Sequence, residues 1–462
     1  MSLPLERKVS FSLEFLNLGC GRWRCVCAGS EKLVRKCDEN ITLESLASIF
    51  ILKSILELSR FQMKILQVFN SYLQFGGEEA AVDEIGEALR RHHEVDDFYG
   101  SSSEMLGRTW IDKVQAPFKA IWNWNAFEKL RRLQADRQFD VWLVHNVFPG
   151  LSPAVYDAAR LSGVPIVQYL HNYRFGCVNG FLLNHGEPCV RCLNGNFLPA
   201  VRTRCWRESR LACATMAISL SRLRGVGVFS QVAHWIAISH VQKEIHTRFG
   251  ILGGRITVLY HYYRGPSRSR TGRARDVLFV GRLSPEKGVQ ILIDAWKKTG
   301  IRDRFLWIVG EGPFRGHLEE LAGSCPNIRF AGLMRGEELS QRWLNAAVTV
   351  VPSIWEEPFG RVLIESWAHG VPVVAARIGA LPELIGLTSA GWLFEAGSSA
   401  SLAELLRGVL SDESANSTVA AKCHEAVSKF SEEDWLSRIE VILEQAINGS
   451  RTSVPPVQDI RT

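Results

Sequence analysis

The 462-residue sequence lacks an apolar run long enough to cross a membrane. A spanning helix needs about 20 predominantly apolar residues in a row, and the best candidate, residues 43–58, contains Glu44, Lys53 and Glu57. The start of the chain also lacks the basic stretch, clean apolar run and small-residue cleavage site of a secretory signal. These absences predict a cytoplasmic protein, with peripheral contact at the inner face of the membrane left open.

A strong imbalance of charge is absent as well. Lys and Arg number 54 against 48 Asp and Glu, which gives a formal net charge of +6. A nucleic-acid-binding domain is usually more basic and gathers its cations in a stripe or patch, so we expect no nucleic-acid partner. The 46% hydrophobic content is that of a soluble globular protein, and the length suits about two to three domains.

Disulfides are not expected for the 11 cysteines. In a long chain without a secretory signal, cysteines are more often free thiols or metal ligands. One group has a Cys-x2-Cys pair flanked by single cysteines, with turn-forming Asn179-Gly180 and His185-Gly186 between them. The group comprises Cys177, Cys189, Cys192 and Cys205. Its spacing allows a structural zinc site or four reduced thiols in an ordinary loop.

A regular alternation of strands and helices begins only at Met63. Residues 1–62 show no such alternation, and we expect an extension outside the catalytic fold; an accessory helix over residues 43–58 is the alternative. After Met63, residues 64–69 predict a buried strand, Gly76-Gly77 a turn and residues 82–91 a helix. A strand, a glycine loop and a helix in this order open a doubly wound domain.

The alternation continues through two halves of the chain. Further strands are predicted at 139–145, 165–170, 232–238 and 256–260, then at 277–280, 305–309, 328–330, 348–351 and 373–375, with helices at 154–161 and 289–298. We expect a first domain over 63–265, a linker over 266–275, a second domain over 276–430, a helix over 431–448 that crosses back to the first domain, and a tail over 449–462. The predicted fold is α/β, with two Rossmann-like, doubly wound parallel sheets facing a cleft.

The loop from Gly281 to Gly288 has the residues of a phosphate cradle. It leaves a strand and enters a helix, where free backbone amides and the helix dipole favour anions. Glycine lets the backbone approach a ligand closely, and Arg282 and Lys287 add two positive charges. The alternative is a solvated loop with two ordinary surface cations, because short glycine motifs often arise by chance.

Two acids, Glu357 and Glu365, are separated by seven residues around a Pro-Phe-Gly turn. Gly360 marks the entry into a helix, so Glu357 should lie in the loop and Glu365 about one turn into the helix. Both carboxylates can then face one cleft and accept hydrogen bonds from sugar or ribose hydroxyls. Stabilisation of the helix dipole explains either acid alone, but not the surrounding pattern.

Taken in order, these motifs resemble glycosyltransferase family 4. The matching segments are the Gly-Arg…Glu-Lys-Gly loop, the Glu-x7-Glu segment, Gly370-Val371-Pro372 and Gly379-Ala380-Leu381-Pro382-Glu383. The resemblance implies a GT-B fold and transfer from a nucleotide sugar with retention at the anomeric carbon. By position it assigns the donor diphosphate to Arg282 and Lys287, the ribose to Glu365 and the donor sugar to Glu357.

The resemblance also implies roles for smaller groups. Backbone at Phe359 and Gly360 would assist Glu357, His171 would lie by the donor sugar, and Gly77 would approach the donor phosphates or the acceptor. The chain departs from the family at His261, where asparagine is common. This departure affects the local detail of the cleft and not the expected fold.

The sequence contains no Asp-x-Asp motif to hold a divalent metal. We therefore expect metal-independent transfer with no cofactor required for catalysis, in which Arg282 and Lys287 neutralise the charge of the leaving diphosphate. Two alternatives remain: a nucleotide-sugar epimerase of the same fold, and an inactive subunit that binds a partner.

One segment, residues 191–224, holds seven arginines and a single acid, Glu208, a local net charge of +6. The apolar residues among them are Trp206, Leu211, Met216, Ile218, Leu220 and Leu223. A basic helix with interleaved apolar residues can lie on an anionic membrane, which would fit a lipid-linked sugar acceptor in surface polysaccharide synthesis. The alternative is a solvated helix that packs its apolar side on its own domain.

Overall fold

The computed structural model describes residues 13–17, 23–27, 62–72, 76–103, 110–268 and 274–452. The chain forms two units, residues 1–61 and residues 62–462. In the first unit, β1 (Leu13–Asn17) pairs antiparallel with β2 (Trp23–Cys27), a hairpin that the sequence did not predict. The alternative helix at residues 43–58 lies outside the described residues.

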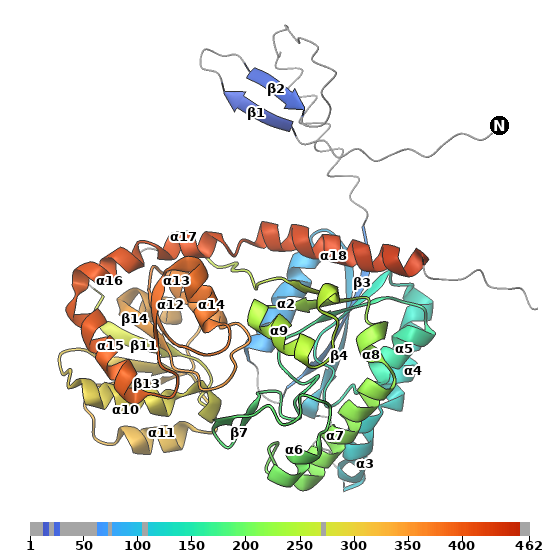
Figure 1. The fold of residues 1–462 in the computed structure, drawn as a ribbon, viewed down its shortest axis with the longest axis horizontal. Coiled ribbons are helices and arrows are strands. Elements are labelled where there is room, and N and C mark those ends of the chain that lie inside the picture. Colours follow the sequence, from blue (N-terminus) through green and yellow to red (C-terminus); the bar gives the residue numbers. More distant parts are fainter. Residues whose placement is uncertain are drawn as a thin grey trace, which may run out of the picture. The chain divides into compact units, whose positions relative to one another are not determined.

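The first large domain contains a six-stranded parallel sheet in the order β10-β9-β6-β5-β3-β4 (Figure 1). The strands are β3 (Lys64–Ser71), β4 (Glu94–Ser101), β5 (Val141–Val144), β6 (Ile166–Tyr169), β9 (His234–Ala237) and β10 (Ile256–Val258). Its helices are α2 (Gly77–Leu89), α3 (Trp110–Ile121), α4 (Trp124–Arg137), α5 (Ala154–Leu161), α6 (Leu198–Thr203), α7 (Arg210–Gly225), α8 (Val228–Gln231) and α9 (His240–Arg248).

The second large domain repeats the plan, with the parallel order β13-β12-β11-β14-β15-β16. The strands are β11 (Asp276–Val280), β12 (Leu306–Val309), β13 (Ile328–Gly332), β14 (Ala346–Val351), β15 (Val373–Ala376) and β16 (Gly391–Phe394). The helices are α10 (Val289–Thr299), α11 (Arg315–Ala322), α12 (Gly336–Asn345), α13 (Arg361–Ala368), α14 (Leu381–Thr388), α15 (Ser399–Ser411), α16 (Glu413–Ala420) and α17 (Cys423–Ser428). The prediction of two doubly wound parallel sheets is confirmed.

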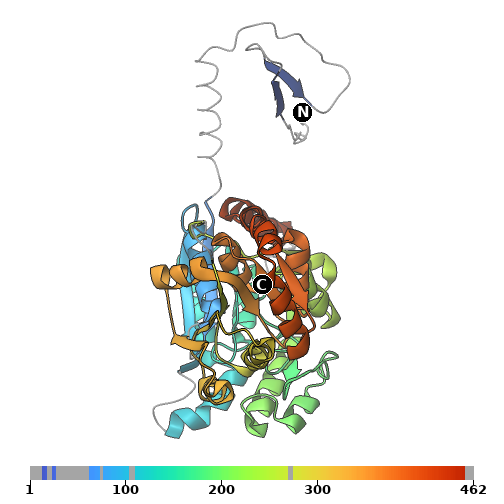
Figure 2. The same ribbon diagram turned by 90° about the vertical axis from the view of Figure 1, so that its left-hand side faces the viewer.

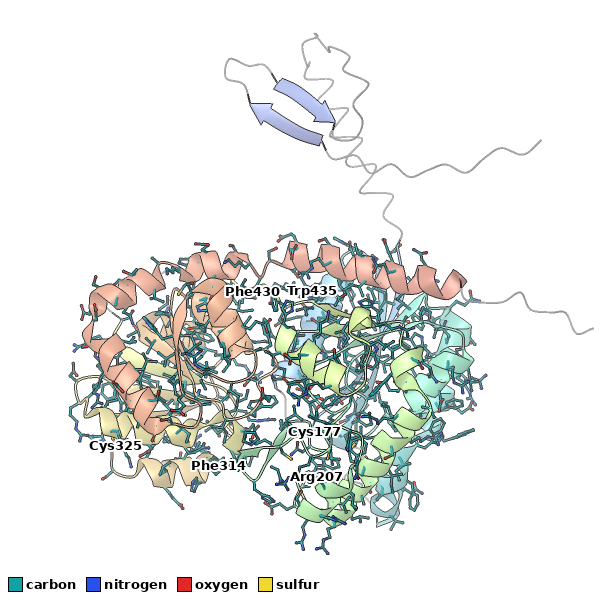
Figure 3. All side chains as sticks on the ribbon, in the orientation of Figure 1. Cys177, Arg207, Phe314, Cys325, Phe430 and Trp435 are labelled. Atoms are coloured by element: carbon teal, nitrogen blue, oxygen red, sulfur yellow. The ribbon has the colours of Figure 1, made fainter. Side chains whose placement is uncertain are left out.

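The last helix, α18 (Glu432–Thr452), returns the chain to the first domain. Figure 3 labels Phe430 and Trp435 where the chain crosses. Trp435 is buried, and its ring lies 4.7 Å from that of Tyr262. Glu440 accepts a hydrogen bond at 2.8 Å from His92, which follows α2. The helix therefore ties both domains together. None of the described helices is both long and apolar enough to cross a membrane.

Candidate functional site

The cradle loop is locked in place by the backbone of the neighbouring strand. Gly288 has φ +71°, and a Cβ at this position would lie 1.8 Å from the Pro352 carbonyl oxygen, so no larger residue fits. Within the loop, Arg282 donates to Glu286 at 2.7 Å and to Ser284 at 3.3 Å. Burial raises the pKa of Glu286, but Arg282 and Ser284 more than offset it, so the net pKa is lowered. Arg282 is thus a half-exposed cation already oriented by one carboxylate.

The second cradle cation is paired with the first acid of the Glu-x7-Glu segment. Lys287 Nζ lies 2.9 Å and 3.1 Å from the two carboxylate oxygens of Glu357. Ser353 Oγ donates to the same carboxylate at 2.9 Å and Trp355 Nε1 at 3.0 Å. Glu357 is 6% exposed, and three donors fix its orientation. A buried carboxylate held this firmly is pre-organised for contact with a ligand.

The second acid, Glu365, lies on helix α13, whose first backbone amides are not capped by a side chain. Gly360 precedes α13 with φ +99°, and no side chain caps the helix. Its first amides are therefore available to an anionic or hydroxyl-bearing ligand. Glu365 is partly buried, and burial raises the pKa of its carboxyl while the Arg361 charge lowers it. Among the described residues, none donates a hydrogen bond to this carboxylate.

Three histidines from the first domain face this segment. His145, His171 and His261 follow the ends of β5, β6 and β10, and His145 Nδ1 lies 2.8 Å from His171 Nε2. The ring of His261 stacks 6.0 Å from that of His171 and meets Phe359 edge-on at 5.1 Å. Burial lowers the pKa of His171 to about 3, with a further contribution from Arg361. Burial also holds the pKa of His145 and His261 well below the usual value, which favours the neutral imidazoles. The departure from the family at His261 places an imidazole ring in contact with both His171 and Phe359.

The first glycine loop is closed by an acid of the following helix. Glu79 on α2 accepts hydrogen bonds from the amides of Tyr72 and Gly76, both at 2.9 Å. Gly77 is exposed, with open space where a Cβ would stand. The neighbouring Glu78 is partly buried, and burial raises the pKa of its carboxyl to about 7.

Sequence reasoning missed the residues that join the two domains. Arg361 Nη2 contacts both carboxylate oxygens of Glu84 on α2, at 2.6 Å and 2.7 Å, and Nη1 donates to the Gly77 carbonyl at 3.3 Å. Glu383 accepts from the amides of His240 and Val241 at the start of α9. Arg361 lies between the two acids of the Glu-x7-Glu segment, so a cation beside that segment was the available signal.

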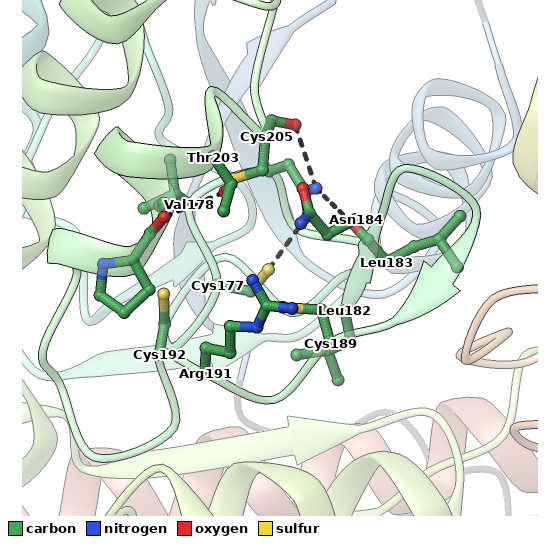
Figure 4. A pocket seen from close by; sticks show the side chains of 13 residues that line it. Cys177, Val178, Leu182, Leu183, Asn184, Cys189, Arg191, Cys192, Thr203 and Cys205 are labelled. Carbon is green, nitrogen blue, oxygen red and sulfur yellow. Dashed lines mark hydrogen bonds between the residues drawn. The ribbon is translucent and has the colours of Figure 1, made fainter.

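The four cysteines of the predicted zinc group do come together. Cys177, Cys189, Cys192 and Cys205 line one cavity of about 20 Å³ (Figure 4). Burial raises the pKa of the Cys192 thiol to about 11 and that of Cys205 to about 12. In the described part of the chain, no three His, Cys, Asp or Glu side chains are already arranged as a metal site.

The basic segment is not one continuous helix, which corrects that expectation. It contains α6 and α7, and three of its apolar residues, Met216, Leu220 and Leu223, are buried in the first domain. The burial of these three residues agrees with the alternative, in which the helix packs its apolar side on its own domain. Leu211 and Ile218 are 68% and 53% exposed. Only these members of the apolar group can therefore contact a surface outside the domain to any large extent.

Comparison with known proteins agrees with this architecture. Family models described as "Glycosyltransferase Family 4" and "Glycosyl transferases group 1" match residues 75–262 and 267–429. The sulfoquinovosyl transferase of Arabidopsis thaliana is 33% identical over 164 residues, 34% of this chain and 30% of that protein. The phosphatidyl-myo-inositol mannosyltransferase of Mycobacterium leprae is 33% identical over 189 residues, 39% of this chain and 49% of that protein. These matches span about a third to half of each relative.

Solved structures show the same fold at lower identity. The structure of Anabaena HepE in complex with UDP superposes with a TM-score of 0.60 at 19% identity, covering 83% of this chain and all of that one. At this identity the likeness concerns the fold alone. With two parallel-sheet domains, the ordered glycine and acid motifs, and a family model on each half, the chain belongs to glycosyltransferase family 4 and has the GT-B fold.

Proposed function

We propose that the protein is a retaining glycosyltransferase that moves a sugar from a nucleoside-diphosphate sugar to an acceptor. The observation that carries this proposal is the fixed Glu357 carboxylate beside Lys287 and the open start of α13. Glu365, which accepts no hydrogen bond from any described residue, suits the ribose hydroxyls of the nucleotide. The complex of Anabaena HepE with UDP supports a nucleotide-sugar donor.

Departure of the nucleoside diphosphate builds negative charge on its phosphates. Arg282, Lys287 and the first amides of α13 are oriented before the reaction, so they stabilise that charge without reorganising. Glu357 faces the positive charge that develops on the sugar. His171 is neutral and can accept or donate one hydrogen bond to a sugar hydroxyl. Retention follows when the acceptor attacks the face from which the diphosphate leaves.

We expect transfer to be independent of divalent metal, because two cations of the chain stand where the diphosphate charge develops and the sequence has no Asp-x-Asp motif. The test is hydrolysis or transfer from UDP-glucose and GDP-mannose, with and without EDTA. Unchanged rates in EDTA agree with the proposal; loss of activity that Mg²⁺ or Mn²⁺ restores contradicts it.

The same assay separates the two alternatives. An epimerase would convert the donor sugar without consuming an acceptor, and an inactive subunit would neither bind nor turn over a donor. Binding is measured as a rise in melting temperature, because a ligand of the native state stabilises it by mass action. A donor that raises the melting temperature and is then hydrolysed favours the transferase.

The acceptor in this proposal is a lipid-linked sugar met at an anionic membrane. Four arginines on and between α6 and α7, at positions 202, 204, 207 and 210, are exposed. α3 packs against α7, and both lie at one end of the first domain (Figure 1, Figure 2). There Phe118 and Trp124 are 68% and 62% exposed beside Lys119 and Lys129, around a cleft of about 630 Å³. Aromatic rings among cations suit a lipid headgroup region.

Co-sedimentation with vesicles tests this partner. We expect binding to vesicles that contain anionic phospholipid, weaker binding as salt rises, and loss of binding when the four arginines become glutamine. The control removes four exposed cations of the second domain, Lys298, Arg302, Arg407 and Lys422. Equal recovery with neutral and anionic vesicles, or equal loss in both variants, contradicts the membrane role.

A further inference from the structure

We propose that Cys177, Cys189, Cys192 and Cys205 hold one structural Zn²⁺. Four of the described cysteines reach one cavity from separate positions along a 29-residue stretch (Figure 4). The volume of the cavity is about 20 Å³, which is enough for about one water molecule or one metal ion. Four thiolates in a closed set are a common ligand group for structural zinc.

Two of the cysteines begin the same local turn. Cys177-Val178-Asn179-Gly180 and Cys192-Leu193-Asn194-Gly195 share the pattern Cys-aliphatic-Asn-Gly. In each turn the glycine amide donates to the cysteine carbonyl, at 3.1 Å and 3.0 Å, and the glycine has φ +81° or +82°. The shared closure gives Cys177 and Cys192 the same local backbone, a turn that can direct amides at a cysteine sulfur. Amides directed at sulfur stabilise a metal-bound thiolate.

The segment that carries the cysteines has little regular structure to hold it. Between β6 and α7 it forms only the two-residue strands β7 (Leu183–Asn184) and β8 (Glu187–Pro188) and the short α6. Asn179 bridges it, donating to the carbonyls of Leu183 at 2.6 Å and Cys205 at 3.2 Å. A metal bound by all four cysteines would fasten the same parts of the loop to one another, which is how zinc stabilises small loop-rich modules.

The thiols must change partners to bind the ion. In the structure Cys177 Sγ donates to Asn179 Oδ1 at 3.1 Å, a hydrogen bond that this thiol gives up when the ion binds. The four thiols of the described loop are not yet placed as a metal site, so all of them must move toward the ion. On binding, each thiol loses its proton to solvent and forms one Zn–S bond, so Zn²⁺ and four thiols give a dianionic site and four protons. Arg174 near Cys177 and Arg191 at the cavity wall supply two positive charges to balance it.

The zinc loop also reaches the donor site. Phe181, one residue beyond the first turn, packs edge-on against Trp355 with ring centroids 5.2 Å apart. Trp355 in turn donates to Glu357. The ion would therefore fix the position of Phe181, and through Trp355 the orientation of Glu357, without touching the donor.

Elemental analysis of the full chain, purified without chelator, is the first test. We expect about one equivalent of zinc, and less than about half an equivalent overturns the proposal, since a closed thiolate site binds tightly. Replacement of the ion by Co²⁺ should give the intense visible bands and thiolate charge-transfer absorption of a tetrahedral cobalt–sulfur site. A weak octahedral spectrum would overturn the thiolate assignment even where metal is present.

Variants then identify the ligands. Cys192→Ser should lose the zinc, whereas Cys325→Ser and Cys423→Ser, which lie outside the cavity, should retain it. Zinc kept in Cys192→Ser, or lost equally in all three variants, overturns the ligand set. Release of zinc from the folded native chain by a mercurial, with four thiols titrated per ion, gives a measurement that does not depend on whether the Cys192 variant folds.

Discussion

Replacing Lys287 by alanine is expected to slow sugar transfer by about 10²-fold or more, the scale on which enzymes lose rate when one pre-organised charge partner of the transition state is removed. The expected effect has two sources. In the proposed mechanism Lys287 supplies a positive charge for the leaving diphosphate, and in the structure it donates to both oxygens of the buried Glu357. Without it, Glu357 keeps Ser353 and Trp355 as partners but loses its counter-charge.

The same measurement applies to the second cation of the cradle. Arg282→Ala should also slow turnover by about 10²-fold or more, and it leaves Glu286 without its counter-charge, with Ser284 as its remaining side-chain partner. The matched control is Lys298→Ala, which removes a half-exposed lysine paired with Asp294 on α10 and should leave the rate near normal. Near-normal rates in both variants would contradict the proposal that Arg282 and Lys287 bind the donor diphosphate.

Gly379→Ala should abolish most of the activity although it adds one methyl group. Gly379 has φ +57°, and a Cβ there would lie 2.4 Å from both the amide nitrogen and the carbonyl oxygen of Glu357. Backbone at that distance cannot remain in place, so the loop that carries Glu357 must shift. A misplacement of about 1 Å in a catalytic group costs about 10²-fold in rate, and we expect a loss of that size.

Gly386 offers the control for this change, because it lies in α14 and nothing stands within 4 Å of a Cβ there. Gly386→Ala should be active and at least as stable, since alanine favours a helix over glycine. Melting temperatures and transfer rates of both variants give the comparison. A Gly379→Ala protein that is folded and fully active would show that transfer does not depend on the exact position of the Glu357 loop.

The sequence was a sufficient guide to the fold because most strands are buried on both faces. Such strands are continuous apolar runs, and those predicted at 64–69, 139–145 and 373–375 correspond to β3, β5 and β15. β4 was missed because it is an edge strand with the sequence Glu-Val-Asp-Asp-Phe-Tyr, whose residues are mostly exposed or half-buried. An edge strand pairs on one side only and carries no continuous apolar signal.

The site was predicted less completely, for a different physical reason. Glycines and acids at fixed spacing reveal one loop, and Glu357 could be placed beside Gly360 from the sequence alone. The partners of these groups come from distant parts of the chain: Glu84 reaches Arg361 across 277 residues. Pairings of this kind depend on how two domains meet, which local patterns do not encode. The cysteine group could be predicted because its members are close in sequence.

The contact of Glu383 with α9 bears on how easily the two large domains can separate. This carboxylate of the second domain accepts hydrogen bonds from the amides of His240 and Val241 and from Tyr260 Oη, at 2.9, 3.2 and 2.7 Å. The second domain thus caps a helix of the first domain from outside. Separating the domains would break all three bonds, each worth about 1.5–3 kcal/mol with a charged acceptor. Any opening of the two domains therefore has to uncap the start of α9.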